Sequence, residues 1–271
     1  MFQICEDVAT AVNWLQQERG MGEAPVEPVD DPEWFLDMWD KFRALVNTRE
    51  PKPAAPVFLE AQDRLLQAMT SEKGVVSAAD IPPSASDARL SVWKGDITSL
   101  DADAIVNAAN SALLGCWIPG HYCIDNAIHT FAGVQLRLEC ARIMQKQGHE
   151  EPVGQAKVTP GYNLPAAHVI HTVGPMVKGN PTIDQRKQLA QCYLSCLDAA
   201  AGIGARTLAF CCISTGVFGF PQEAGAQIAV STVQAWLDAQ QAKGKPGADM
   251  RVIFDVYLDE DERIYRSILG E

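Results

Sequence analysis

Short apolar segments alternate with longer amphipathic segments along the chain from Leu90 onward. The apolar segments have the length and composition of buried strands, and they lie at 90–93, 104–106, 156–159, 168–173, 208–213 and 251–258. Helical patterns occur between or after them, at 125–147, 184–202, 222–240 and 259–269. Strands that alternate with helices form a parallel or mixed sheet covered on both faces. The sequence therefore predicts a three-layer α/β/α fold with a mixed, largely parallel central sheet.

The first 88 residues have a different pattern and are expected to form a helical N-terminal extension with a linker. Apolar residues at helical spacing predict three helices, near 8–15, 35–45 and 59–69. Proline-rich breaks separate these helices, and residues 71–88 have the composition of a linker. The predicted domains are thus residues 1–88 and residues 89–271. The tryptophans of the extension would suit either packing against the second domain or contact with a substrate.

Charge and composition exclude several classes of protein. The net charge is −12, and residues 1–50 contribute −7 of it, four basic against eleven acidic residues. Binding to nucleic acid requires clustered Lys and Arg, which are absent, so no nucleic-acid partner is expected. No apolar run approaches the roughly 18–20 residues of a membrane helix, and no signal pattern is present. We therefore expect a cytoplasmic protein without membrane contact, whose eight cysteines are thiols or metal ligands rather than disulfides.

The densest group of reactive side chains follows the strand expected at 104–106. Asn107 and Asn110 come first, and Asp125 stands at the start of the next expected helix. Amides and a carboxylate this close together suit the binding and acid–base chemistry of an active site. His129, one helical turn after Asp125, either supports this site or packs as an ordinary core histidine.

Cys116, His121 and Cys123 lie within this same stretch, in a turn-forming loop that contains Pro119 and Gly120. Two thiolates and an imidazole suit Zn²⁺. No fourth ligand is evident nearby, and three protein ligands leave one position for water or substrate, as in catalytic zinc sites. Free thiols beside a solvent-exposed histidine are the alternative.

A second candidate loop follows the strand expected at 208–213 and precedes a helix. Backbone N–H groups in such a place can bind an anion. The loop lacks the Lys-Ser or Lys-Thr of a Walker motif and the three glycines of a dinucleotide fingerprint, so an ordinary turn is the alternative. Its candidate ligand-binding residues are Ser214, Thr215, Gly216, Val217 and Phe218.

Four segments, taken together and in this order, resemble the macrodomain family of ADP-ribose-binding and ADP-ribosyl-hydrolysing proteins. They are Gly-Asp-Ile-Thr at 95–98, Asp-Ala-Ile-Val-Asn-Ala-Ala-Asn at 103–110, His-Val-Ile-His-Thr-Val-Gly-Pro at 168–175 and Ser-Thr-Gly-Val-Phe-Gly-Phe-Pro at 214–221. The insert at 115–129 is similar to that of the zinc-containing macrodomains, microbial enzymes that also carry a helical N-terminal extension. The resemblance thus accounts for both predicted domains.

The resemblance implies how ADP-ribose would lie on the chain. Asp96 should accept a hydrogen bond from the adenine amino group, and Ile97 should contact the ligand through its backbone. The loop 214–218 should surround the diphosphate, with Phe218 against the distal ribose, the sugar that is linked to protein. The same resemblance implies that Zn²⁺ on the cysteine and histidine insert lies beside that ribose.

The resemblance also implies catalytic residues. Asn107 and Asn110 should approach the distal ribose, and Asp125 aligns with the catalytic aspartate of macrodomain hydrolases. Many of those hydrolases have a glycine-rich loop before this aspartate, where this chain has the metal-binding insert. Zinc is therefore expected to orient a ribose hydroxyl or water, with acid–base help from Asp125.

The predicted function is that of a zinc-dependent hydrolase. It would act on mono-ADP-ribosylated protein and cleave the bond between the distal ribose and an acidic side chain. Two alternatives remain at this point: a non-catalytic reader that binds ADP-ribose and has a structural zinc, and an enzyme that acts on small molecules such as O-acetyl-ADP-ribose.

Overall fold

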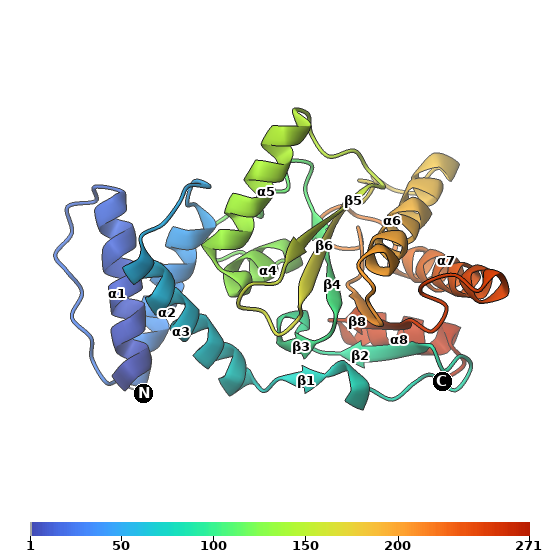
Figure 1. Cartoon of the computed structure of the whole chain (residues 1–271), viewed down its shortest axis with the longest axis horizontal. Coiled ribbons are helices and arrows are strands. Elements are labelled where there is room, and N and C mark those ends of the chain that lie inside the picture. Colours follow the sequence, from blue (N-terminus) through green and yellow to red (C-terminus); the bar gives the residue numbers. More distant parts are fainter. Residues whose placement is uncertain (1) are drawn as a thin grey trace.

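The computed structural model describes residues 2–271, and its centre is a six-stranded sheet (Figure 1). The strand order is β2-β8-β7-β4-β6-β5, and every neighbouring pair is parallel except β5 and β6. The six strands are β2 (Leu90–Lys94), β4 (Ala104–Ala109), β5 (Ala156–Pro160), β6 (His168–Val173), β7 (Thr207–Phe210) and β8 (Arg251–Val256). The mixed, largely parallel sheet predicted from the sequence is therefore confirmed.

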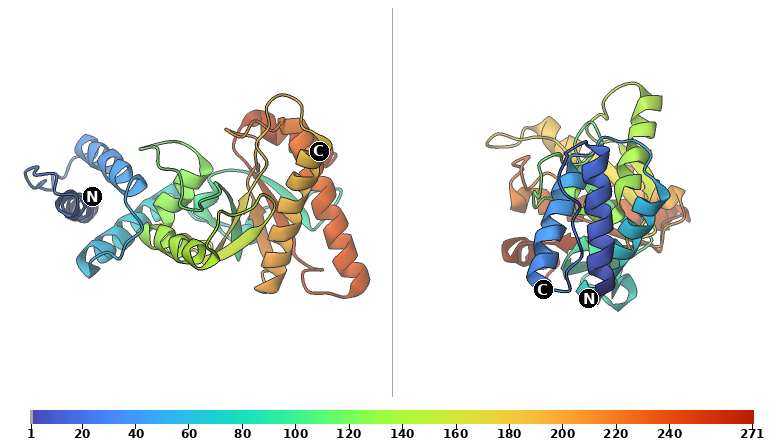
Figure 2. Two further views of the ribbon diagram at one scale, coloured as in Figure 1. Left: turned by 90° about the horizontal axis from the view of Figure 1, so that it is seen from above. Right: turned by 90° about the vertical axis from the view of Figure 1, so that its left-hand side faces the viewer.

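Helices cover both faces of the sheet and give the three predicted layers. On one side of the sheet, α4 contacts β4 and α5 contacts β5 (Figure 2). On the other side, α6 contacts β5 and β6, and α8 contacts β2 and β8. Helix α7 packs against both α6 and α8. These helices are α4 (Ile124–Ala132), α5 (Val134–Gln147), α6 (Ile183–Gly202), α7 (Gln222–Lys243) and α8 (Asp259–Ile268). No helix within residues 2–271 has the length and apolar character that crossing a bilayer requires.

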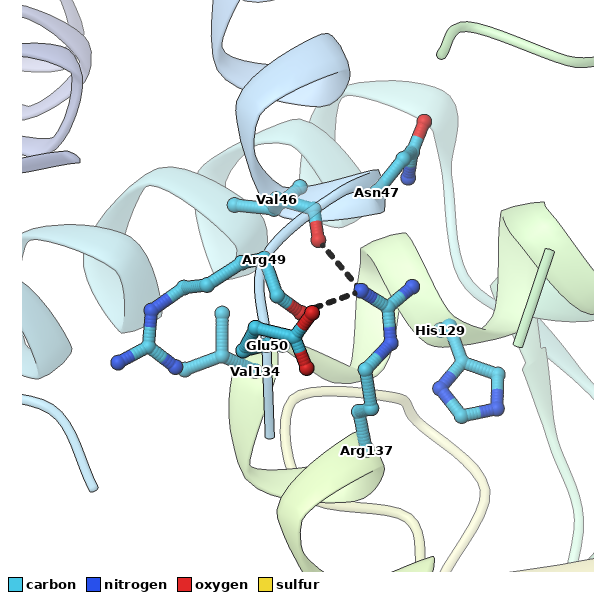
Figure 3. Close-up of a pocket in the computed structure, with 8 residues that line it drawn as sticks. Val46, Asn47, Arg49, Glu50, His129, Val134 and Arg137 are labelled. Carbon is cyan, nitrogen blue, oxygen red and sulfur yellow. Dashed lines mark hydrogen bonds between the residues drawn. The ribbon is translucent and has the colours of Figure 1, made fainter. Parts of the chain in front are cut away.

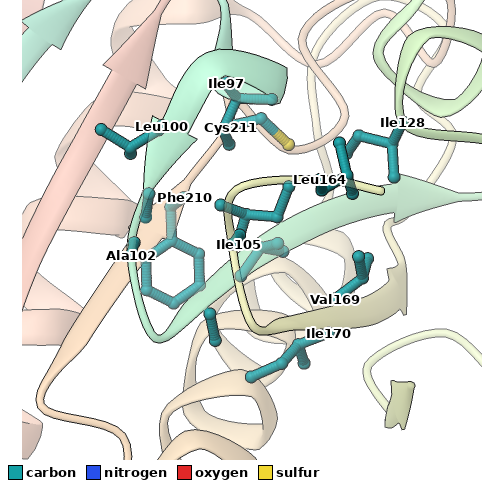
Figure 4. Packing of buried hydrophobic residues seen from close by; sticks show 14 of the residues in the cluster. Ile97, Leu100, Ala102, Ile105, Ile128, Leu164, Val169, Ile170, Phe210 and Cys211 are labelled. Carbon is teal, nitrogen blue, oxygen red and sulfur yellow. The ribbon is translucent and has the colours of Figure 1, made fainter. Parts of the chain in front are cut away.

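The core lies between the sheet and these helices. Figure 4 shows Ile105 of β4, Val169 of β6, Phe210 of β7 and Ile128 of α4 among the buried side chains of this core, in which Phe210 lies against Tyr193 of α6. These side chains are almost completely buried. Apolar residues on both faces of the central strands explain why the strands appear in the sequence as continuous apolar runs rather than as alternating patterns.

The extension forms three helices at one end of the molecule (Figures 1 and 2). They are α1 (Phe2–Glu18), α2 (Pro32–Asn47) and α3 (Pro56–Lys73). Asp31 caps α2 by accepting a hydrogen bond from the Trp34 N–H at 2.8 Å, and Pro32 occupies the first turn, where its missing N–H costs nothing. Helices α2 and α3 both contact α4, so the extension packs on the α/β domain beside its candidate site.

Two details of the predicted organisation are wrong. The helix expected at 125–147 is two helices, because Gly133 has φ +94° and ends α4; a Cβ there would lie 2.6 Å from the Gln62 amide nitrogen. The expected linker at 71–88 contains the end of α3, the strand β1 (Val76–Ser77) and a 3-10 helix η1 (Ala78–Asp80). Strand β1 pairs in parallel with β3 (Leu100–Asp101), so this segment is structured.

Candidate functional site

The parallel strands bring the predicted site segments to one edge of the sheet. Lys94 pairs with Val256 where β2 and β8 end, so Asp96 and Tyr257 follow neighbouring strands. The loop at 214–218 follows β7 in the middle of the sheet, and Asn107 lies near the end of β4. Ligands of parallel α/β proteins bind at the carboxyl ends of the strands. The site is therefore an elongated one, from Asp96 through the loop to Asn107.

At one end of this site, the buried Asp125 carboxylate holds two amide side chains. Its Oδ1 accepts a hydrogen bond from Asn107 Nδ2 at 2.8 Å, and its Oδ2 accepts one from Asn110 Nδ2 at 3.3 Å. Burial raises the pKa of Asp125 to about 6, although the bond from Asn107 acts in the opposite direction. Asn107 Oδ1 is buried and accepts no hydrogen bond within residues 2–271. A buried acceptor without a partner is uncommon in a folded protein, so this oxygen marks a candidate position for a ligand hydroxyl.

His171 of β6 fixes the orientation of Asn107 from behind. The Nδ2 group of Asn107 is 3.1 Å from His171 Nδ1, and His171 Nε2 is 2.9 Å from Thr159 Oγ1. Because an amide nitrogen only donates, Nδ1 is the acceptor and the ring carries its proton on Nε2. Complete burial lowers the pKa of His171 to about 4, which keeps the ring neutral. Because the neutral His171 ring accepts the hydrogen bond from Asn107 Nδ2, the Asn107 Oδ1 atom points away from the His171 ring.

Acid is expected to destabilise the protein through His171. The unfolded histidine has a pKa of about 6.5 and the folded one about 4, so the unfolded chain binds the proton first. Stability from the neutral ring is complete above about pH 6.5 and is lost as the pH falls toward 4, by about 3 kcal/mol in total. Urea unfolding of metal-free protein measures this effect. From about pH 7.5 to about pH 4.5, His171→Gln should lose about 2 kcal/mol less stability than the wild type; equal losses would contradict the assignment.

His129 is buried beside Asp125, with 3.6 Å between its Nε2 and Asp125 Oδ1. Neither ring nitrogen has a hydrogen-bond partner within the described chain, and burial keeps the pKa well below its usual value. Its ring borders a small cavity of about 10 Å³, room for about one water. In Figure 3 the Arg137 guanidinium lies next to this ring and donates to the carbonyls of Val46 (2.9 Å) and Arg49 (2.8 Å). His129 is therefore a buried, neutral histidine between Asp125 and Arg137.

The three predicted metal ligands are brought together. Cys116 Sγ is 3.4 Å from His121 Nδ1, and the donor atoms of these two residues and of Cys123 lie within 4.8 Å of one another. Tetrahedral zinc with usual bond lengths places nitrogen and sulfur ligands about 3.6 Å apart. Among residues 2–271 no fourth histidine, cysteine or carboxylate joins this group. The donor set and its spacing fit Zn²⁺ with one position open.

Residues of the extension and of α5 support the metal-binding loop. Asn47, at the end of α2, accepts a hydrogen bond from the Gly120 N–H at 3.1 Å and donates to Thr130 Oγ1 at 3.0 Å. Arg137 lies 4.8 Å from the centre of the Trp117 ring. These contacts connect the loop to two helices that the sequence does not mark as part of a site.

The central loop has the geometry of an anion site. Ser214 has φ +67° and its buried Oγ has no partner in the described chain. Gly219 has φ +71°, and a Cβ there would lie 2.7 Å from the Val177 carbonyl. The backbone N–H groups of 216–218 are not used in the hydrogen bonds of the turn. Free N–H groups beside the start of α7 can bind a diphosphate. Pro221 is the N-cap residue of α7.

Asp96 lies at the other end of the site. Its Oδ1 accepts hydrogen bonds from Thr98 N at 3.0 Å and Thr98 Oγ1 at 2.6 Å, and its Oδ2 is 2.7 Å from Lys73 Nζ. Burial raises the pKa of Asp96, but the bonds from Lys73 and Thr98 outweigh this effect and lower it below the usual value. The Ile97 side chain is buried in the core, so only its backbone is left for a ligand.

The comparisons with known proteins give matches that span most of the chain. The Macro domain family model matches residues 106–229. A protein-ADP-ribose hydrolase of Treponema medium is 49% identical over 230 residues, which cover 84% of this chain and 86% of the relative. This chain belongs to the macrodomain family. A protein-ADP-ribose hydrolase of Staphylococcus aureus is 44% identical over 260 residues. These residues cover 96% of this chain and 93% of the relative.

A solved macrodomain of Trypanosoma brucei in complex with ADP-ribose has the same fold. It is 28% identical to this chain and superposes with a TM-score of 0.64. The match covers 84% of this chain and 95% of the Trypanosoma brucei chain. The three-layer fold, the helical N-terminal region and the family predicted from the sequence are therefore confirmed.

Three side chains of the site were not found from the sequence. Tyr257 is 76% exposed and directly follows β8, the strand that neighbours β2, so it lies at the same edge of the sheet as Asp96; an aromatic residue at the end of an apolar strand was the available signal. Lys73 and Arg137 contact the site from helices, and nothing in the local sequence distinguishes them from surface residues. Their positions depend on how the extension packs on the macrodomain.

Proposed function

We propose that this macrodomain is a zinc-dependent hydrolase that removes mono-ADP-ribose from an acidic side chain of a modified protein. Two relatives that span most of the chain are named protein-ADP-ribose hydrolases. The observation that carries the proposal is the buried Asp125 with its two amides, next to three metal-ligand side chains with an open position. Binding alone would not need this combination.

ADP-ribose fits the site in one direction. Adenine would lie between Asp96 and the exposed Tyr257 ring, where the carboxylate accepts the amino group. The diphosphate would accept hydrogen bonds from the N–H groups of 216–218. The distal ribose would then reach Asn107 and Asp125 at the other end. This order follows the strand order β2-β8-β7-β4.

The side chains around the distal ribose have separate tasks. Asn107 Oδ1 accepts a hydrogen bond from a ribose hydroxyl, and its amide is held by Asp125 and His171. Asp125 accepts a proton from the attacking water, which it orients toward the bond that breaks. Zn²⁺ on Cys116, His121 and Cys123 would supply a Lewis acid next to this ribose. Asp and Glu are proposed as the modified side chains because, when the bond to the distal ribose breaks, the side chain leaves as a stable carboxylate.

The test is release of ADP-ribose from a protein that carries mono-ADP-ribose on Glu or Asp. The same protein modified on Ser, and O-acetyl-ADP-ribose, serve as comparison substrates under identical conditions. Faster release from the acid-linked protein is expected. No release despite binding of ADP-ribose would make the protein a reader, and faster cleavage of O-acetyl-ADP-ribose would make its substrate a small molecule.

A further inference from the structure

The last residue of α3 reaches from the extension into the site. Lys73 Nζ is 2.7 Å from Asp96 Oδ2 and 3.4 Å from Thr98 Oγ1, and it lies 3.3 Å from the centre of the Phe131 ring of α4. An ammonium group has three N–H bonds. The carboxylate, the hydroxyl and the ring face therefore use all three, so Lys73 has no donor left for a ligand.

The same contacts determine which acceptor Asp96 keeps. Each carboxylate oxygen accepts about two hydrogen bonds. Oδ1 accepts from Thr98 N and Thr98 Oγ1, so it is fully used. Among residues 2–271, Lys73 is the only donor to Oδ2, so this oxygen retains one acceptor position. Lys73 thus fixes the carboxylate in the rotation that leaves Oδ2 free.

We propose that Lys73 is a positioning residue for adenine recognition, so that the N-terminal extension forms part of the ligand site. The proposal rests on the proposed function, because it takes the adenine amino group as the donor to Asp96. Lys73 acts through Asp96 and does not touch the ligand. The contact lies at the junction of the two parts of the chain, since β1 follows directly after it and pairs with β3.

Binding of ADP-ribose and docking of the extension are coupled as a result. A ligand that holds Asp96 in its present rotation favours the arrangement in which α3 supplies Lys73. By linkage, docking of α3 raises the affinity for the ligand by the same factor. The extension is therefore more than a packing element.

The test compares Lys73→Met with a matched control in the full chain. The control is Lys41, which forms an ion pair with Glu23 within the extension. The side chains of this pair are 31% and 43% exposed, and those of Lys73 and Asp96 are 30% and 43% exposed. Calorimetry measures the dissociation constants of ADP-ribose, ADP and IDP, in which a carbonyl replaces the 6-amino group. Lys73→Met should weaken ADP-ribose binding roughly tenfold and reduce the preference for ADP over IDP. Lys41→Met should change neither.

A double-mutant cycle separates positioning from a purely structural effect. If Lys73 acts through Asp96, Lys73→Met has no further effect on ADP-ribose affinity in an Asp96→Ala background. Additive effects, or equal effects of Lys73→Met and Lys41→Met, would overturn the proposal. Failure of the wild type to bind ADP-ribose would instead refute the proposed function. Melting temperatures of all variants show that each one is folded.

Discussion

Asp125→Asn is expected to lower kcat for release of ADP-ribose from acid-linked protein by at least about 100-fold. The substitution keeps the shape of the side chain, and the new Oδ1 can still accept the hydrogen bond from Asn107 Nδ2, while the bond from Asn110 Nδ2 is lost because an amide nitrogen replaces Oδ2. It removes the negative charge that accepts a proton from water. Affinity for ADP-ribose should change far less than kcat, by about threefold or less, because Asn107 keeps its bond to residue 125 and Asn110 Nδ2 keeps its bond to the Gly115 carbonyl.

Asp125→Ala serves as the comparison for this variant. It removes the acceptor of both amides, so it should weaken ADP-ribose binding as well as turnover. Zinc content is measured in both variants because Asp125 is two residues from Cys123. Wild-type turnover in zinc-loaded Asp125→Asn would show that another group activates the water.

The fold could be predicted because its signal is local. Each central strand is an apolar run whose length matches a buried strand, and the helices between them start at recognisable residues such as Thr182, which forms a capping box with Gln185. The break at Gly133 was missed because helical periodicity continues on both sides of it. Its positive φ depends on contact with Gln62 of α3, which is distant in the sequence.

The candidate site was predictable to the extent that its residues follow strands. Asn107, Asp96 and the loop 214–218 all come at or after the carboxyl end of a parallel strand, so topology alone brings them to one edge. Cys116 and Cys123 were recognisable from ligand chemistry at short spacing. Residues that support the site from behind carry no such signal. Arg137 is one of several arginines on helices, and it is buried by packing against the end of α2 and the Trp117 ring.

Cys123→Ala is expected to abolish both zinc binding and hydrolysis. The wild type should contain one zinc per chain, because Cys116, His121 and Cys123 converge on one position, whereas in the buried group of His129, Cys140 and His171 both His171 nitrogens are hydrogen-bonded to protein. The two remaining ligands cannot hold the ion against a chelator. The zinc content should therefore fall below about one-tenth of a zinc per chain, and the rate of ADP-ribose release should fall by about 100-fold or more. Elemental analysis of the purified protein and the release assay measure the two effects. The proposed adenine and diphosphate contacts come from other segments, Asp96 and the N–H groups of 216–218, so binding of ADP should persist.

Cys192→Ser is the matched control for the loss of a thiol. Cys192 is buried and its Sγ donates to the carbonyls of Val173 and Gln188, which a serine hydroxyl can also reach, and it lies outside the metal-binding group. This variant should keep its zinc and its activity. Chelation of the wild type followed by addition of Zn²⁺ should remove and restore release, which links the loss to the ion rather than to the mutation. Full turnover by zinc-free Cys123→Ala would show that the ion only stiffens the loop, and catalysis would then depend on Asp125 and the two amides alone.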